Sequence, residues 1–134
     1  AGPTSRIAIR WLLQRPPSWA VADLGCGDAQ LARSVPQRVR SFDLIAAAPG
    51  VEAANLAALP LGAACLDAAV FCLSLMGTDY GLFLEEAARV LKPGGWLWIA
   101  EVQSRSVGGW TVGMEGYILF LALAQVLVVD YIMF

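Results

Sequence analysis

The spacing of hydrophobic and polar positions in the first half of the chain predicts helices and strands in alternation. Residues 6–14 have the apolar spacing of a short amphipathic helix, and Pro16 and Pro17 end it because proline lacks a backbone N–H. A second helix is expected at residues 29–34. Short apolar runs bounded by turn residues predict strands at residues 19–24, 41–44 and 51–54.

A longer helix is expected at residues 79–91, because apolar residues recur there at helical spacing. The expected apolar side carries Leu82, Phe83, Ala87, Val90 and Leu91. The expected polar side carries Glu85, Glu86 and Arg89. Proline and two glycines, Pro93 to Gly95, end this helix.

Strands flank this helix on both sides. Residues 67–73 form a continuous apolar run, which is typical of a strand covered on both faces, and residues 96–102 return to strand composition. Strands and helices therefore alternate from Trp19 onward. This order predicts an α/β fold with right-handed crossovers and a Rossmann-like, doubly wound, mostly parallel sheet.

The end of the chain has a different character. Residues 117–134 are an almost unbroken apolar run, about as long as a minimal membrane span. Gln125 and Asp130 lie inside it, and no basic cluster flanks it, which argues against a membrane partner. A buried helix and strand is the preferred interpretation, and a membrane span or a disordered end are the alternatives.

Composition narrows the function classes. The chain has 134 residues, 58% of them hydrophobic, which suits one domain with its own core. Six of its nine basic residues precede position 41, so the first 40 residues carry a charge of +4 and the rest −6. A basic end can attract a polyanion, although a solvated surface is the commoner explanation.

Residue types exclude further classes. The chain has no histidine, which rules out Ser-His-Asp and Cys-His catalysis and removes the commonest metal ligand, so we expect no metal site. Its three cysteines form no Cys-x-x-Cys pair, and the N-terminus does not have the order of a secretory signal. These features predict a reducing compartment.

The stretch V-A-D-L-G-C-G-D, residues 21–28, is the first candidate binding element. A strand that ends in Asp-x-Gly-x-Gly before a helix puts bare backbone and free helical N–H groups where a ligand can approach. An ordinary glycine turn with capping aspartates is the alternative. Gln30 stands where a dinucleotide fingerprint has its third glycine, which argues against a hydride-transfer dehydrogenase.

Two further features strengthen the binding hypothesis. Asp43 follows Gly25 by 18 residues, at the end of the next strand, where an acidic side chain can accept hydrogen bonds from the ribose hydroxyls of adenosine. A turn aspartate is the alternative at this position. The stretch L-K-P-G-G-W-L, residues 91–97, predicts a tight helix-to-strand turn and is more specific than two glycines.

These motifs carry a resemblance. D-L-G-C-G-D and L-K-P-G-G-W-L resemble motifs of class I S-adenosylmethionine-dependent methyltransferases. A-V-F-C-L-S-L-M-G-T at residues 69–78 and F-L-E-E-A-A-R-V-L-K-P-G-G at residues 83–95 are similar to the nucleomethylin-like family of nucleolar ribosomal-RNA-processing methyltransferases. The resemblance covers residues 5–105. It implies a class I methyltransferase fold that is incomplete at both ends, with a partial S-adenosylmethionine-binding domain at residues 1–105 and a divergent apolar tail at residues 106–134.

The resemblance also implies a cofactor and the residues that contact it. The cofactor is S-adenosylmethionine, and its expected contacts are Gly25, Asp43, Asn55, Leu56 and Cys72. The family usually has Asp-Met where this chain has Asn55 and Leu56. Asparagine can still accept from and donate to the adenine edge. No residue is assigned as catalytic.

The implied activity is methylation of an adenine ring nitrogen in large-subunit ribosomal RNA, in the nucleus and nucleolus, with chromatin-silencing proteins as further partners. A ring nitrogen with a free lone pair needs no general base, which agrees with a chain that lacks histidine. A small-molecule methyltransferase and a non-catalytic cofactor- or partner-binding module are the alternatives. Because the family's upstream region and last strands have no counterpart, we expect weak cofactor binding, poor catalysis and an exposed sheet edge at residues 96–102.

Overall fold

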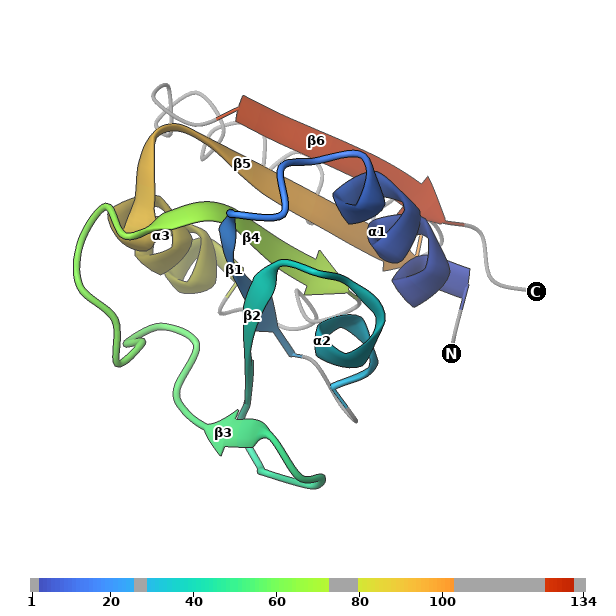
Figure 1. The fold of residues 1–134 in the computed structure, drawn as a ribbon. Helices are drawn as coiled ribbons and strands as arrows, with labels where there is room; N and C mark the ends of the chain where they lie inside the picture. Colours follow the sequence, from blue (N-terminus) through green and yellow to red (C-terminus); the bar gives the residue numbers. More distant parts are fainter. Residues whose placement is uncertain (1–2, 26–28, 73–79, 103–124, 132–134) are drawn as a thin grey trace.

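The computed structural model describes residues 3–25, 29–72, 80–102 and 125–131. Within these residues the chain forms one sheet of six parallel strands in the order β3-β2-β1-β4-β5-β6 (Figure 1). The elements in chain order are α1 (Pro3–Leu13), β1 (Ala20–Leu24), α2 (Gln30–Ser34), β2 (Arg38–Asp43), β3 (Val51–Ala53), β4 (Leu66–Cys72), α3 (Tyr80–Val90), β5 (Leu91–Val102) and β6 (Gln125–Tyr131).

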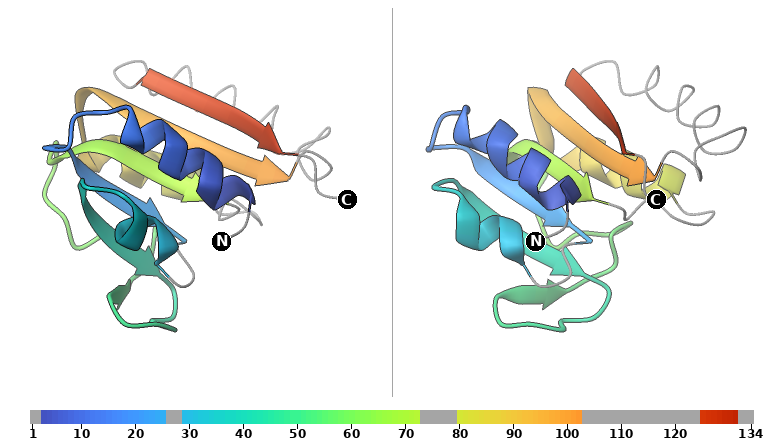
Figure 2. Two further views of the ribbon diagram at one scale, coloured as in Figure 1. Left: turned by 45° about the vertical axis from the view of Figure 1, so that its right-hand side comes forward. Right: turned by 90° about the vertical axis from the view of Figure 1, so that its right-hand side faces the viewer.

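The sheet is covered by helices on both faces. Figure 2 shows α1 and α2 on one face and α3 on the other. Successive strand residues point to opposite faces, as the two-residue period of a strand requires. Toward α1 and α2 point Val21, Ala68, Val70 and Trp98. Toward α3 point Ala22, Leu24, Ala69, Phe71, Leu97 and Ile99. The predicted doubly wound, parallel α/β fold is confirmed.

Two strands begin earlier than the sequence pattern predicts. β2 begins at Arg38 rather than Ser41, because its pairing with β1 starts at Ala20 and Arg38. β5 begins at Leu91 rather than Trp96, because Leu91 already pairs with Leu66 of β4. The register then shifts, so the residues of the predicted helix-to-strand turn form an irregular segment inside β5.

Helix α3 buries most of the side chains expected on its apolar side, with two differences. Leu84, Ala87 and Val90 are fully buried, whereas Leu82, expected on the apolar side, is 53% exposed. Glu86, expected on the polar side, is only 8% exposed. The reason is the connection between β3 and β4, residues 54–65, because its Leu59 N–H donates a hydrogen bond to the Glu86 carboxylate.

The expected sheet edge at residues 96–102 is not an edge. β6 pairs in parallel with β5 from Trp96 and Gln125 to Val102 and Tyr131. The sequence Q-V-L-V-V-D-Y is rich in valine, which favours strands, and this part of the apolar tail therefore extends the sheet. None of the helices in the described residues has the length and hydropathy needed to cross a membrane. The predicted domain boundary at residue 105 lies outside the described residues.

Candidate functional site

The predicted contact residues gather at the carboxyl ends of neighbouring strands. The chain moves from β1 to β2 on one side and later returns to β4 on the other side, which makes a topological switch point. Leu24 of β1 pairs with Phe42 of β2 and with Phe71 of β4. The residues that directly follow these three are Gly25, Asp43 and Cys72. In open α/β sheets, ligands bind outside the carboxyl ends of the strands at such a point.

Gly25 begins the turn after β1 in a conformation that favours glycine. Its φ is +77°, and its N–H donates a hydrogen bond of 2.8 Å to the Phe42 carbonyl oxygen. Ala29, which precedes α2, is also left-handed, with φ +61°, and is buried. A side chain in this region raises the free energy of the folded state by about 1–2 kcal/mol. Cys26, Gly27 and Asp28, which complete the predicted glycine motif, lie outside the described residues.

Asp43 is the last residue of β2 and is half-buried. Its Oδ1 accepts the Leu44 N–H at 2.8 Å, which orients the carboxylate, and its carbonyl oxygen accepts the Ala54 N–H at 2.8 Å. A carboxylate has about four lone-pair positions on its two oxygens, so it can accept several hydrogen bonds at once. Asp43 can therefore accept hydrogen bonds from a ligand's hydroxyl groups.

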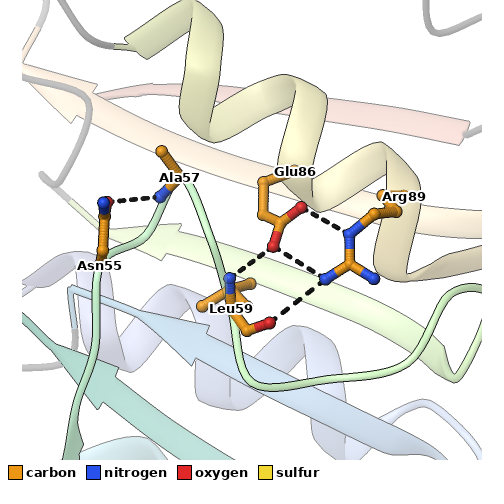
Figure 3. A network of polar contacts seen from close by, with 5 residues as sticks. All are labelled: Asn55, Ala57, Leu59, Glu86 and Arg89. Atoms are coloured by element: carbon orange, nitrogen blue, oxygen red, sulfur yellow. Dashed lines mark hydrogen bonds and ion pairs between the residues drawn. The ribbon is translucent and has the colours of Figure 1, made fainter.

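Asn55 and Leu56 follow β3 by two and three residues. The Asn55 Oδ1 accepts the Ala57 N–H at 2.9 Å (Figure 3). The Asn55 carbonyl oxygen accepts the Ala58 N–H at 3.0 Å. The Leu56 side chain is 8% exposed and belongs to the core on the α3 side of the sheet. A ligand at this strand end would therefore contact the side chain of Asn55 and the backbone of Leu56.

Cys72 closes the set at the end of β4, where it pairs with Ala100 of β5. Its backbone places it at the same edge of the sheet as Gly25 and Asp43. The family-like run that continues from it, residues 73–78, lies outside the described residues.

A network of polar contacts joins α3 to the connection after β3 and is absent from the sequence-based prediction (Figure 3). The Arg89 Nε donates to the Glu86 Oε1 at 2.6 Å, and its Nη2 donates to the Glu86 Oε2 at 2.8 Å and to the Leu59 carbonyl at 3.2 Å. The Leu59 N–H donates to the same carboxylate. The hydrogen bond from Arg89 lowers the pKa of Glu86 and outweighs burial, which raises it. Helical spacing brings Glu86 and Arg89 together as an i,i+3 pair, but it gives no signal for their contacts with Leu59, which lies in a distant loop.

The K-P-G-G motif lies at the opposite end of the sheet from the candidate site. The Lys92 Nζ is 3.2 Å from the Asp67 Oδ1, and the Asp67 Oδ2 accepts the Ala20 N–H at 2.8 Å. These contacts join the amino ends of β1, β4 and β5. A Cβ on Gly95 would meet the Lys92 carbonyl oxygen at 2.9 Å. This motif therefore shapes the amino end of the sheet and does not line the carboxyl edge.

The residues at the carboxyl edge fit an adenosine-containing cofactor. Asp43 offers a carboxylate for two ribose hydroxyls, Gly25 offers backbone without a side chain, and Asn55 offers an amide for the adenine edge. In the part of the chain that the structure describes, no group of three or more His, Cys, Asp or Glu side chains could hold a metal ion.

Solved structures share this fold. An S-adenosylmethionine-dependent methyltransferase from Mesorhizobium loti aligns with a TM-score of 0.56 and 28% identity, over 70% of this chain and 51% of that one. A geranyl diphosphate C-methyltransferase from Streptomyces coelicolor, solved with S-adenosyl-L-homocysteine, aligns with a TM-score of 0.58 and 22% identity, over 68% of this chain and 42% of that one. The fold is that of class I methyltransferases.

Curated relatives are closer in sequence. Ribosomal RNA-processing protein 8 of Arabidopsis thaliana is 53% identical over 97 residues, which is 72% of this chain and 34% of that protein. The rat protein of the same name is 56% identical over 103 residues, 77% of this chain and 22% of that protein. The 25S rRNA (adenine(645)-N(1))-methyltransferase of Schizosaccharomyces pombe is 51% identical over 89 residues, 63% of this chain and 28% of that enzyme. The chain thus spans between about a fifth and a third of the length of these relatives.

A family model matches most of the chain. The model described as hypothetical methyltransferase matches residues 2–115, which is well over half of the chain. Its range includes every predicted contact residue and both glycine motifs. The chain belongs to this family of methyltransferases.

Proposed function

We propose that this chain is the cofactor-binding part of an S-adenosylmethionine-dependent methyltransferase that methylates an adenine ring nitrogen of large-subunit ribosomal RNA. The observation that carries the substrate class is the close sequence similarity to proteins named for ribosomal RNA processing and for adenine methylation of 25S rRNA. The proposed place of action is the nucleus, and within it the nucleolus. A link to chromatin-silencing proteins stays a prediction.

The residues at the carboxyl edge divide the task of holding the cofactor. When bound, S-adenosylmethionine supplies a methyl group on a positively charged sulfur. Asp43 accepts hydrogen bonds from the ribose hydroxyls, and Gly25 lets the ligand approach the backbone. Asn55 and the Leu56 N–H face the adenine edge, and Cys72 completes the contacts at the end of β4.

This chemistry requires orientation more than proton transfer. An adenine ring nitrogen with a free lone pair can attack a methyl group without first losing a proton, so a chain without histidine is suited to it. Holding the two reactants in line can lower the barrier by roughly 7–11 kcal/mol at best. The role we assign to the described residues is therefore to position the cofactor.

The expectation of weak cofactor binding stays a prediction. One of its premises was an exposed edge at residues 96–102, and the pairing of β6 with β5 removes that premise. In the described sheet, β4 and β5 each pair with a strand on both sides.

The test is transfer of a radiolabelled methyl group from S-adenosylmethionine to deproteinised large-subunit rRNA, followed by digestion and identification of the labelled nucleoside. We expect label in a ring-methylated adenosine, and much less of it with the Asp43→Ala variant at the same subsaturating cofactor concentration. Label in small acceptors instead of RNA would favour a small-molecule methyltransferase. Cofactor binding without transfer to any acceptor would favour a binding module, and either result would overturn the proposed substrate.

A further inference from the structure

We propose that Glu86 and Arg89 of α3 are positioning residues that set the adenine specificity of the cofactor site. They fix the connection between β3 and β4, residues 54–65, in the geometry in which Asn55 and Leu56 would hydrogen-bond to adenine (Figure 3). The inference rests on the proposed function, because it concerns the same cofactor site. It assigns a role to two residues that lie on a helix and not at the carboxyl edge itself.

The first observation is the way successive backbone N–H groups of this loop are used. The Ala57 N–H donates to the Asn55 Oδ1, and the Ala58 N–H donates to the Asn55 carbonyl. The Leu59 N–H donates to the Glu86 carboxylate. Among the described residues, none accepts the Leu56 N–H. The Leu56 N–H is therefore the donor in this series that we assign to a ligand.

The second observation is that both backbone polar groups of Leu59 are hydrogen-bonded to side chains of α3. Glu86 accepts its N–H, and the Arg89 Nη2 donates to its carbonyl oxygen at 3.2 Å. The two side chains are joined by two charge-assisted hydrogen bonds, of 2.6 and 2.8 Å, so neither can move alone. Glu86 is 8% exposed, which keeps water from competing for these bonds.

The third observation is a second attachment of the same loop to α3. The Ala64 N–H donates to the Arg89 carbonyl and the Cys65 N–H donates to the Val90 carbonyl, both at 2.8 Å. The last carbonyls of a helix lack partners within the helix, so these bonds also satisfy the end of α3. The loop is therefore fixed to one rigid element at Leu59 and again before β4.

Fixing the loop has a chemical consequence at Asn55. Because its Oδ1 accepts from Ala57, the oxygen end of the amide is defined, and its second lone pair can accept from the amino group of adenine. The Leu56 N–H can donate to a ring nitrogen. Hypoxanthine, the base of inosine, has an acceptor where adenine has a donor and a donor where adenine has an acceptor, because it carries a carbonyl oxygen in place of the amino group and a proton on N1. A rigid loop should reject it, whereas a loose loop could rearrange.

The experiment is a calorimetric comparison of two ligands, S-adenosylhomocysteine and its inosine analogue, with the 134-residue chain. We expect the wild type to prefer the adenosine ligand by about tenfold, the effect of one hydrogen bond. Glu86→Ala should reduce this preference to about threefold or less, mainly through weaker binding of the adenosine ligand. Glu86→Gln keeps an acceptor for the Leu59 N–H and should restore most of the preference. Glu85→Ala, on the neighbouring exposed position of α3, is the matched control and should change nothing.

The ratio of the two affinities separates positioning from simple stabilisation. A merely structural role would weaken both ligands equally and leave their ratio unchanged, which would overturn the inference. Should Glu86→Ala fail to fold, Arg89→Gln gives the second test, with the same expected loss of preference and amide hydrogen exchange at Leu59 as a further readout. If the wild type bound neither ligand, the proposed function itself would fail. If it discriminated and the variants discriminated equally, only the present inference would fail.

Discussion

The Gly25 N–H donates a 2.8 Å hydrogen bond to the Phe42 carbonyl oxygen and thereby joins the turn after β1 to the last residues of β2. Phe42 pairs with Leu24 in the parallel register of these strands, so Gly25 and Asp43 leave the sheet side by side. Two segments that are distant in sequence thus present bare backbone and a carboxylate at one place. This relationship explains how the carboxyl edge can hold an adenosyl group.

The left-handed conformation of Gly25 leads to the first prediction. Gly25→Ala should lower the free energy of unfolding by about 1–2 kcal/mol, because φ is +77° there, and should also weaken S-adenosylmethionine binding by about tenfold or more, because a Cβ would meet the ligand. Gly50→Ala is the matched control, since Gly50 has φ +84° and open space around it. It should show the stability loss alone. Equal affinities for the two variants, measured by calorimetry, would make the Gly25 turn purely structural.

The second prediction concerns Asn55, where the family usually has aspartate. Asn55→Asp keeps the acceptor for the Ala57 N–H and replaces a neutral acceptor for the adenine amino group by a charged one. Charge-assisted hydrogen bonds are roughly twice as strong, so cofactor affinity should rise about threefold to tenfold. Asn55→Ala should bind more weakly than the wild type. If neither variant changes the dissociation constant, Asn55 does not contact the cofactor.

The third prediction is a pH dependence of stability. The pKa of Glu86 is lowered, mainly by its hydrogen bonds from Arg89, so the carboxylate stabilises the fold above the ordinary glutamate pKa of about 4.3. That stabilisation is lost as the pH falls through the lowered value. Urea unfolding should show the wild type more stable than Glu86→Gln by about 1–3 kcal/mol near neutral pH, with a difference that shrinks below about pH 4.

The exposed pair of Arg40 and Glu52 provides the control for this measurement. Its atoms are 2.7 Å apart, but both side chains are nearly half exposed, at 47% and 44%. Glu52→Gln should therefore change the free energy of unfolding by less than about 1 kcal/mol at any pH. A difference between wild type and Glu86→Gln that stays constant down to about pH 3 would contradict the account of Glu86.

Most of the fold follows from sequence pattern, because apolar periodicity reports burial of each local segment. The alternation of strands and helices from Trp19 to Val102 is present as predicted. The strand at Gln125–Tyr131 does not follow from the sequence in this way, because an apolar run alone does not reveal its pairing partner. The burial of Glu86 could not be predicted either, because it depends on Leu59, 27 residues away in the sequence.

The candidate site also has parts that follow from local sequence patterns and parts that do not. The positions of Gly25, Asp43 and Cys72 at strand ends follow from local patterns, and the register of the sheet brings them to one edge. Leu56 is a case that a local pattern does not decide, because its side chain lies in the core on the α3 side of the sheet, which leaves its backbone as the part proposed to contact a ligand. The K-P-G-G motif shows the converse, because a specific sequence signal lies far from the site.

That position of the motif gives the fourth prediction. Gly95→Ala should lower the free energy of unfolding by about 1–3 kcal/mol, because the new Cβ would lie 2.9 Å from the Lys92 carbonyl oxygen and 3.2 Å from that of Asp67. Cofactor affinity in the folded variant should not change. Gly62→Ala, with no atom within 4 Å of the new Cβ, should leave stability unchanged or slightly raised. A selective loss of cofactor affinity in Gly95→Ala would place the motif in the binding site after all.

The last prediction tests the central claim that the carboxyl edge of β1 and β2 holds S-adenosylmethionine. The measurement is a calorimetric titration of S-adenosylmethionine into the wild type, Asp43→Ala and Glu85→Gln, the last being a matched change at an exposed carboxylate. The wild type and Glu85→Gln should bind alike. Asp43→Ala, confirmed as folded by circular dichroism, should lose about 1.5–3 kcal/mol of binding free energy, more than tenfold in Kd, because two ribose hydroxyls lose a charged acceptor. Equal affinities of Asp43→Ala and the wild type, or a wild type that does not bind the cofactor, would contradict the claim.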